Sequence, residues 1–138
     1  MARVAGLADV LRPYDGTGPS PSDYYRLTPI MEHVLANFGG TITVQKLAKT
    51  AHLSVSQLQR EFQRLLGMSP MNYLIRVRLF VARREMEDTD EPLGNIALSC
   101  GIHDQSHFAR DFRTRVGIKP GAYRTKFRES RGLPERNW

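Results

Sequence analysis

The apolar and polar positions of this chain follow a helical period from Tyr24 onward. In residues 44–51 and 55–66, apolar side chains recur three and four positions apart, which places them on one face of a helix. No segment alternates apolar and polar residues for long enough to indicate a β-strand. The pattern therefore predicts an all-α fold.

An internal repeat organises the predicted helices. Residues 47–73 align with residues 96–123, at an offset of 49 in the first helix of each copy and of 50 in the second. The matched positions of the second part are Leu58 with Phe108, Arg60 with Arg110, Phe62 with Phe112, Gly67 with Gly117, Pro70 with Pro120, and Tyr73 with Tyr123. The repeat indicates two copies of one supersecondary unit.

The first copy has the boundary signals of a helix-turn-helix. A short helix ends near residue 51, and Ser54 followed by Gln57 then forms a capping box that starts a second helix. Gly67 can adopt the positive φ that ends this helix, which is expected over about residues 55–66. A short helix, a three-residue break and a second helix make a helix-turn-helix.

The second copy repeats this layout. Pro92 is expected to start its first helix, and Asp104 can cap its second helix, which is expected over about residues 104–116. The inward faces of the two second helices supply the predicted cores. These faces are formed by Val55, Leu58, Phe62 and Leu65 in the first copy, and by Phe108 and Phe112 in the second.

A longer helix is predicted between the copies, over residues 71–86, with a length of roughly 24 Å. It can separate the two units as a strut. Its apolar stripe is expected to consist of Leu74, Ile75, Leu79, Ala82 and Met86, widened by Tyr73, Val77, Phe80 and Val81.

The segments before and after these helices differ from them in composition. Residues 13–23 hold three prolines and two glycines, which is typical of a linker, and residues 4–11 can form a short amphipathic helix. We therefore divide the chain into an N-terminal extension (1–25), a first helix-turn-helix subdomain (26–70), a connecting helix (71–88), a second subdomain (89–130) and a tail (131–138).

The distribution of charge makes the chain a candidate to bind an acidic partner. The 138 residues include 20 Lys and Arg against 14 Asp and Glu, a net charge of +6. Residues 55–84 carry six arginines and one glutamate, and residues 104–131 carry eight bases and three acids, so each block has a net charge of +5. Such a balance favours an acidic partner such as nucleic acid, although charged blocks also simply solubilise helices.

The outward face of each second helix carries side chains that can read DNA. Ser56, Gln59, Arg60 and Gln63 follow one another at i, i+3, i+4 and i+7. Gln and Arg form paired hydrogen bonds with adenine and guanine edges in the major groove. Any surface helix is polar outside, but the repeat, the caps and the matched arginines favour the DNA interpretation. The corresponding positions in the second copy are Gln105, Ser106, Ala109, Arg110 and Arg113.

These residues resemble the DNA-binding domain of the AraC/XylS family of bacterial transcription regulators, over about residues 27–128. The second copy, PLGNIALSCGIHDQSHFARDFRTRVGIKPGAYR, carries the most specific match, including Gly101, the two phenylalanines, Gly117 and Pro120. The resemblance implies about seven helices in two homeodomain-like three-helix units joined by a long helix. It also implies that the two recognition helices enter successive major grooves on one face of DNA.

The resemblance assigns roles to individual positions. Base contacts are expected from Ser56, Gln59, Arg60, Gln105, Ser106, Ala109 and Arg110. Ser56 and Ala109 are small, so each can meet a thymine methyl group, act through water or make no contact. Phosphate contacts are expected from Thr43, Gln63, Arg64, His107, Arg113 and Arg124.

Other chemistry is not supported by the sequence. Cys100, His103 and His107 lack a fourth ligand nearby, so no metal site is expected, and the single cysteine excludes an internal disulfide. No nucleophile-base-acid set and no phosphate-binding glycine loop are present, so neither an enzyme nor a cofactor is expected.

The remaining expectations concern partners and location. The alternative function is a protein-interaction module that docks on RNA polymerase or another regulator, with DNA contact secondary. Most members of the family carry a separate ligand-binding or dimerisation domain, which is missing from this chain. Residues 1–23 are interpreted either as the tail of such a domain, which would then supply dimerisation or ligand sensing, or as a short extension of a chain like the family's small stand-alone monomers. No apolar run is long enough to span a membrane, no signal peptide is recognisable, and a cytoplasmic, nucleoid-associated location is expected.

Overall fold

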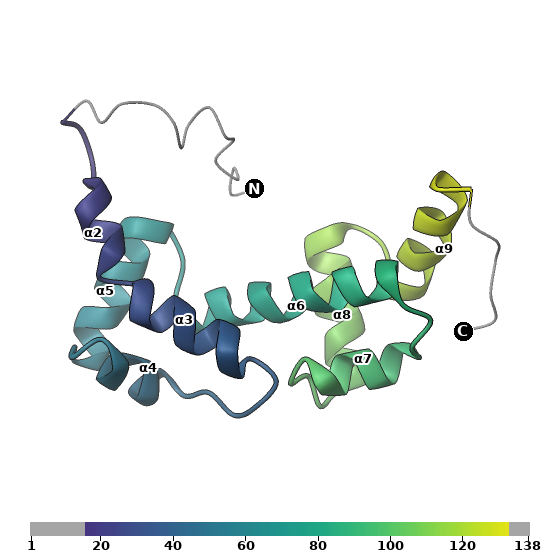
Figure 1. The fold of residues 1–138 in the computed structure, drawn as a ribbon, viewed down its shortest axis with the longest axis horizontal. Helices are drawn as coiled ribbons and strands as arrows, with labels where there is room; N and C mark the ends of the chain where they lie inside the picture. Colours follow the sequence, from purple (N-terminus) through teal and green to yellow (C-terminus); the bar gives the residue numbers. More distant parts are fainter. Residues whose placement is uncertain (1–15, 133–138) are drawn as a thin grey trace.

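The structure, a computed structural model, describes residues 16–132, and within this range every regular element is a helix (Figure 1). The helices are α2 (Pro21–Tyr25), α3 (Thr28–Asn37), α4 (Val44–Thr50), α5 (Val55–Leu66), α6 (Pro70–Asp88), α7 (Leu93–Ser99), α8 (Gln105–Val116) and α9 (Pro120–Ser130). Apart from α2, which has five residues, they are the seven helices that were predicted. The all-α prediction is confirmed, and the helix predicted over residues 4–11 lies outside the described residues.

The ends of α5 follow from local hydrogen bonds. The backbone N–H of Gln57 donates to Ser54 Oγ at 3.1 Å, and the backbone N–H of Ser54 donates to Gln57 Oε1 at 2.9 Å. These bonds satisfy N–H groups that have no partner inside the helix. Gly67 has a φ of 69° and ends the helix in the left-handed conformation. The predicted capping box and the predicted helix over residues 55–66 are confirmed.

The ends of α8 follow the same logic with a different cap. Asp104 Oδ1 accepts a hydrogen bond from the backbone N–H of His107 at 3.1 Å, and Gly117 ends the helix with a φ of 98°. The helix therefore begins at Gln105, one residue later than the lower bound that was predicted, because Asp104 itself is the cap.

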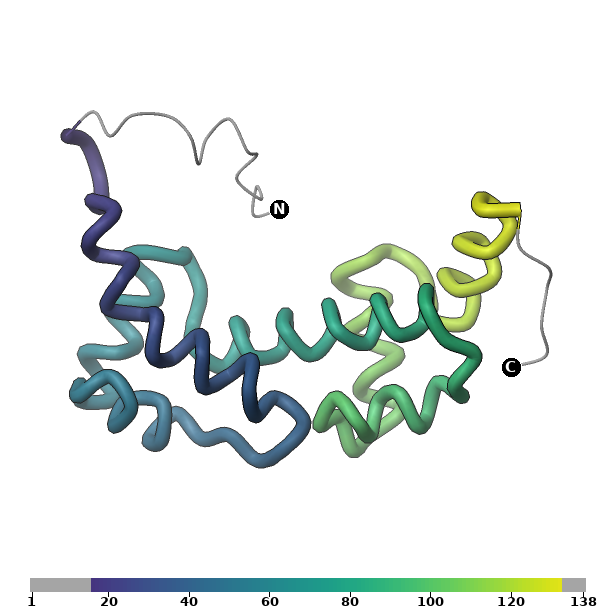
Figure 2. Tube along the Cα trace, in the orientation of Figure 1, coloured from purple at the N-terminus to yellow at the C-terminus, as the bar shows by residue number. Residues whose placement is uncertain are grey.

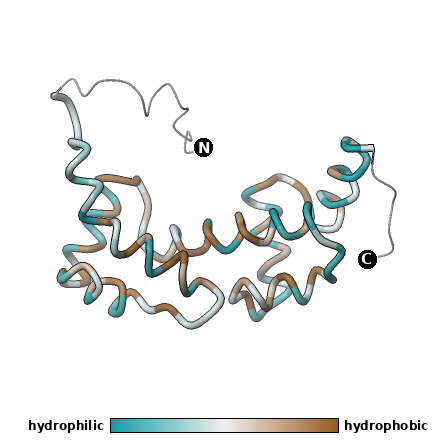
Figure 3. The backbone as a smooth tube through the Cα atoms, in the orientation of Figure 1, coloured by the Kyte–Doolittle hydropathy of each residue, from teal (hydrophilic) through white to brown (hydrophobic). Residues whose placement is uncertain are grey.

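Two hydrophobic cores lie at the two ends of α6, whose own positions alternate between hydrophobic and hydrophilic (Figure 3). Leu74, near the start of α6, is buried in the first core together with Leu58 and Phe62 of α5. Ala82 and Met86, toward its end, are buried in the second core. The connecting helix is therefore part of both cores, which makes it more than a spacer between them.

The repeat explains how one helix serves two units. Pro70 and Pro120 each lie in the first turn of a helix, where the missing N–H of proline is tolerated. The Tyr73 ring meets Phe62 edge-on at 5.8 Å, and the Tyr123 ring meets Phe112 edge-on at 5.6 Å. The start of α6 thus serves as the last helix of the first unit, as α9 does in the second. The end of α6 serves as the first helix of the second unit.

One predicted core position is wrong. Phe80 was expected to widen the apolar stripe of α6, but its side chain is 56% exposed. The buried stripe of α6 passes through Leu79 and Ala82, and Phe80 lies outside it. The guanidinium of Arg83 lies over the Phe80 ring at 5.7 Å instead.

The two second helices share one side of the molecule. In the view of Figure 1, α5 lies behind α3, and α8 lies behind α6; Figure 2 shows the same order along the Cα trace. Both helices also run steeply across the long axis of α6 (Figure 1). Their outward faces are therefore available to a single extended partner.

We predict that Phe62→Ala and Phe112→Ala each destabilise the protein by about 3–5 kcal/mol, because each ring is fully buried and its removal leaves a cavity. Thermal or urea unfolding measures the loss. Phe80→Ala is the matched control, since that ring is mostly exposed, and it should change the stability little. Wild-type stability in both buried-ring variants would contradict the core described here.

Candidate nucleic-acid interface

Helix α5 presents a polar stripe that is held in place by the core beneath it. Leu58 and Phe62 are fully buried, and Leu65 is nearly so, which fixes the rotation of the helix about its axis. The four polar residues of the predicted stripe all lie in the exposed class: Ser56, Gln59, Arg60 and Gln63. The predicted outward face of this helix is therefore confirmed as a surface, while its contacts with DNA stay a prediction.

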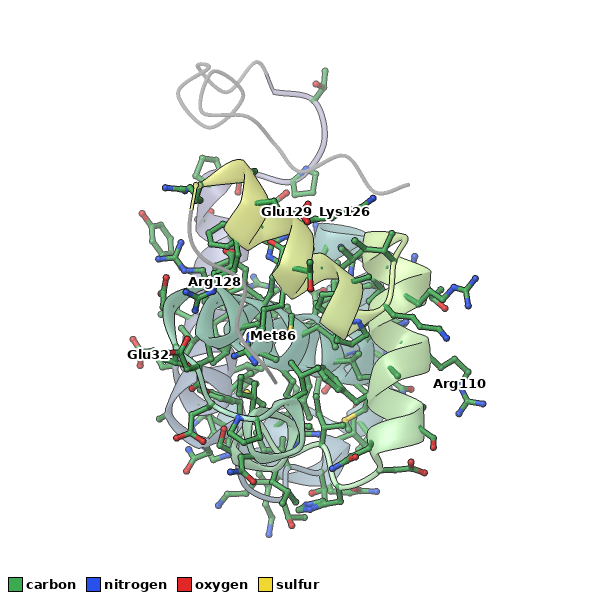
Figure 4. The ribbon with its side chains drawn as sticks, turned by 90° about the vertical axis from the view of Figure 1, so that its right-hand side faces the viewer. Glu32, Met86, Arg110, Lys126, Arg128 and Glu129 are labelled. Carbon is green, nitrogen blue, oxygen red and sulfur yellow. The ribbon has the colours of Figure 1, made fainter. Side chains whose placement is uncertain are left out.

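Helix α8 presents a second stripe in the same way. Phe108 and Phe112 are buried, and their rings meet edge-on at 5.9 Å. Arg110 projects from α8 on the side of the molecule opposite Glu32 of α3 (Figure 4). The positions predicted to read bases or phosphates are exposed at Gln105, Ser106, His107, Arg110 and Arg113, and half-buried at Ala109.

The side chain of Gln105 is oriented by the neighbouring helix. Its amide Nε2 lies against Gly94 in the first turn of α7, in the space where any side chain at position 94 would have its Cβ. Gly94 therefore makes room for this amide, and the structure brings Gln105 to the edge between α7 and α8.

Two of the predicted phosphate contacts, Arg64 and His107, already have partners within the protein. Arg64 Nη2 donates to Glu61 Oε2 at 2.8 Å and lies 3.6 Å from Asp23 Oδ1 of α2. The backbone N–H of Ser20 donates to Asp23 and lowers the pKa of that carboxyl most. The Ser20 hydroxyl lowers the pKa as well, and the charge of Arg64 lowers it further. His107 Nε2 lies 3.4 Å from Asp111 Oδ2, one turn along α8. These two phosphate contacts stay predictions, and each would have to share its side chain with a carboxylate.

The exposed residue Thr43 has a structural role that agrees with its predicted place at a helix start. Its hydroxyl oxygen accepts a hydrogen bond from the backbone N–H of Lys46 at 3.2 Å and caps α4. This helix is the first of the first helix-turn-helix. The phosphate contact of Thr43 stays a prediction.

The prediction that Arg124 contacts phosphate is wrong. Its side chain is fully buried, and three of its N–H groups donate to backbone carbonyls where α6 ends. The distances are 3.0 Å from Nε to Met86 O, 2.9 Å from Nη2 to Thr89 O and 2.7 Å from Nη1 to Glu91 O. Burial, and secondarily the charge of Arg128, lowers the pKa of Arg124. Arg124 is therefore a structural cation that satisfies the free carbonyls at and beyond a helix end.

Two further arginines with structural roles were missed by sequence reasoning. Arg128 Nη2 donates to Thr89 O at 3.2 Å and to Asp90 Oδ1 at 2.8 Å, just after α6. Arg78 donates in the same manner to carbonyls just after α3. The repeat held the signal that could have found them, because Arg78 and Arg128 are 50 residues apart, the offset of the second helices.

The described residues contain no cluster of metal-ligating side chains. Among residues 16–132, no group of three or more His, Cys, Asp or Glu side chains could hold a metal ion. Cys100 is buried in the second core, and burial raises the pKa of its thiol, which disfavours the reactive thiolate. Within the same residues, no helix combines the length and apolar character needed to cross a membrane.

Two linked helix-turn-helix units with polar second helices on one side define a double helix-turn-helix domain. The model of the helix-turn-helix domain family matches residues 47–126, more than half of the chain. The chain belongs to the AraC family of transcription regulators, as the resemblance indicated, and this is a family of regulators and not of enzymes.

Solved structures and a curated relative agree with this assignment. A probable AraC family transcriptional regulator from Rhodopseudomonas palustris CGA009 is 34% identical, with a TM-score of 0.68, over 80% of this chain and 99% of that chain. The DNA-binding domain of AdpA, a global transcriptional factor solved in complex with a target DNA, is 28% identical, with a TM-score of 0.73, over 79% and 98% of the two chains. The transcriptional activator RhaR of Pectobacterium carotovorum subsp. carotovorum (strain PC1) is 28% identical over 127 residues, which are 92% of this chain and 44% of RhaR.

We predict that Arg124→Ala lowers stability by about 3 kcal/mol or more, because it removes three hydrogen bonds at the end of α6, including the donors to Met86 O and Glu91 O. Chemical unfolding measures this loss. Arg113→Ala is the control, since that side chain is exposed on α8 and should leave stability unchanged. A phosphate role for Arg124 would instead show as weakened DNA binding by a variant with wild-type stability.

Proposed function

We propose that this chain binds a specific site on double-stranded DNA and controls transcription, by inserting α5 and α8 into two successive major grooves. The observation that carries the proposal is the pair of exposed Gln- and Arg-bearing stripes on one side of the molecule, each backed by its own aromatic core. The relative AdpA, whose DNA-binding domain was solved with its target DNA, supports it. The basic blocks that contain the two helices supply attraction to the phosphates.

The proposed base contacts differ between the two helices. Helix α5 would read bases through Ser56, Gln59 and Arg60, and its Gln63 and Arg64 would contact phosphates. Thr43, the cap of α4, would contact a phosphate as well. Helix α8 would read bases through Gln105, Ser106, Ala109 and Arg110, with His107 and Arg113 toward phosphates. Since the two sets are not the same, the site should be asymmetric, with two short motifs about one DNA turn apart, roughly 10 base pairs and 34 Å.

The chain spans from 33% to 44% of the length of the first curated relatives that it matches. Dimerisation or sensing of an effector would belong to a further domain, and RNA polymerase would be a partner of the assembled regulator. A cytoplasmic location at the nucleoid follows from the same proposal. The division of the chain into segments at residues 25, 70, 88 and 130 also stays a proposal.

The alternative function is docking on RNA polymerase or another regulator, with DNA contact secondary. It draws support from exposed apolar side chains away from the two stripes, notably Phe80 of α6 and Leu98 of α7, which are 56% and 53% exposed. Single exposed apolar residues are common on protein surfaces, so the two polar stripes favour DNA.

Binding-site selection from random duplexes, followed by footprinting of the selected site, tests the proposal. We expect protection of two segments about one turn apart, and competition by the specific duplex but not by random duplex or RNA. A footprint confined to one groove segment would contradict the two-helix mode. Equal competition by all nucleic acids, together with capture of a regulator or polymerase subunit, would favour the alternative.

We predict that Arg60→Ala and Arg110→Ala each weaken binding to the selected site by about 1–3 kcal/mol, roughly 5- to 150-fold, and relax the preference at one base pair. Electrophoretic mobility shifts on single-substituted duplexes measure both effects. Arg84→Ala is the control, because that exposed side chain lies on α6 near Asp88. An equal loss on every sequence would mean that the arginine contacts phosphate and not a base.

A further inference from the structure

The two helix-turn-helix units touch each other directly, beside Arg78 in the middle of α6. Residues 38–40, which follow α3, lie against residues 99–101, at the end of α7. A Cβ atom at Gly39 would lie 2.7 Å from the carbonyl oxygen of Ser99, and one at Gly101 would lie 2.6 Å from the carbonyl oxygen of Phe38. No side chain fits between these backbones, so only glycine permits the approach.

Arg78 of α6 joins this contact to the shared helix. Its Nε donates to Phe38 O and its Nη2 donates to Gly40 O, both at 2.9 Å. A Cβ at Gly101 would also lie 3.0 Å from Arg78 Nε, so the half-buried guanidinium lies beside residues of both units. Burial lowers the pKa of Arg78, although a guanidinium keeps its charge at any ordinary pH.

The ring of Phe38 adds an apolar component. It packs against the buried residues of both hydrophobic cores, and so belongs to each unit at once. We call the set of residues 38–40, Arg78 and residues 99–101 the inter-subdomain contact. Together with α6, it connects the two units at two places.

Two connections restrict the relative orientation of the two units more than a single helix does. A single helix allows the units to bend and twist about its axis, whereas a second contact off that axis opposes such rotation. The angle between α5 and α8 is then set before DNA is met. Adding one base pair between two half-sites moves the second by 3.4 Å and turns it by roughly 35° about the duplex. A rigid protein cannot follow this turn without losing contacts.

We propose that the inter-subdomain contact determines which separation of the two half-sites this protein accepts. The inference rests on the proposed two-groove binding and adds a specificity determinant that touches no base. Arg78 and Gly39 act as positioning residues, since they orient α8 relative to α5. Two linked binding units gain affinity from each other only when both can engage, so the effect is on the combined affinity and not on either half-site.

Gly39 and Gly40 provide a matched pair of variants. Neither has a positive φ, so alanine is tolerated locally at both positions. A methyl group at position 39 must push against the backbone of Ser99, whereas one at position 40 lies 3.6 Å from the nearest neighbour, Asn37 O, which is ordinary contact. Gly39→Ala therefore opens the inter-subdomain contact, and Gly40→Ala is its control.

The experiment uses the full chain and the duplex obtained by site selection. Affinities are measured for the selected spacing, for spacings one base pair shorter and longer, and for duplexes that keep only one half-site. We expect the wild type and Gly40→Ala to lose about 100-fold in affinity when the spacing changes, because the second unit can no longer engage. We expect Gly39→Ala to lose about tenfold or less, with half-site affinities equal to those of the wild type.

The same assay tests Arg78 with variants that remove one or both of its guanidinium hydrogen bonds. Arg78→Gln should weaken the discrimination between spacings, and Arg78→Lys should do so less, because an ammonium group can still reach one carbonyl. Arg76→Gln, an exposed position on the same helix, is the control and should keep the wild-type ratio. Circular dichroism and thermal unfolding identify any variant that fails to fold. If a variant at Gly39 or Arg78 does not fold, the variant at the other position decides the outcome.

The outcomes separate the two claims. If the wild type selects no duplex, or protects a single segment, the proposed function fails. If the wild type binds both half-sites but tolerates every spacing, or if folded Gly39→Ala and Arg78→Gln keep the full discrimination, the inter-subdomain contact does not determine spacing and the inference is overturned. A loss of half-site affinity in Gly39→Ala would also overturn it, because the defect would then lie within one unit.

Discussion

The burial of one helix in two hydrophobic cores is the constraint on which this architecture depends. The start of α6 supplies Leu74 to the first core, and its later turns supply Ala82 and Met86 to the second. Because a helix rises by about 1.5 Å per residue, the separation of the two units is then set by the number of residues between these positions. The Tyr73 and Tyr123 rings pack against Phe62 of α5 and Phe112 of α8, and this contact inside each core orients the outward stripe of the helix.

The basic residues of the chain serve two purposes. Arg78, Arg124 and Arg128 donate to carbonyls at the ends of α3 and α6, where the helix leaves acceptors without partners. Arg60, Arg110 and Arg113 are exposed on the second helices. The net charge of +6 therefore overstates the charge that is available to a polyanion, since part of it is committed to joining segments that are distant in sequence.

The two units keep the same scaffold while their outward residues diverge. Core positions match in kind across the repeat, as with Phe62 and Phe112, because each must fill a cavity of defined shape. Outward positions face solvent and carry no such requirement, so Gln63 of α5 and Arg113 of α8 can differ freely. One chain can thus hold two different readers, and the inter-subdomain contact would relate them at a fixed angle.

The sequence by itself determined the helices, their order and the two repeated units. Capping at Ser54 and the helix end at Gly67 depend on residues within a few positions, and amphipathic periodicity depends on one face of one helix, so both are readable along the chain. Only the tertiary structure decided that Phe80 is exposed and that Arg124 is buried. Which neighbour covers such a position depends on segments more than thirty residues away, as with the carbonyl of Met86 beneath Arg124. The approach of Gly39 to Ser99 was invisible for the same reason, since contact between two backbones leaves no periodic pattern in the side chains.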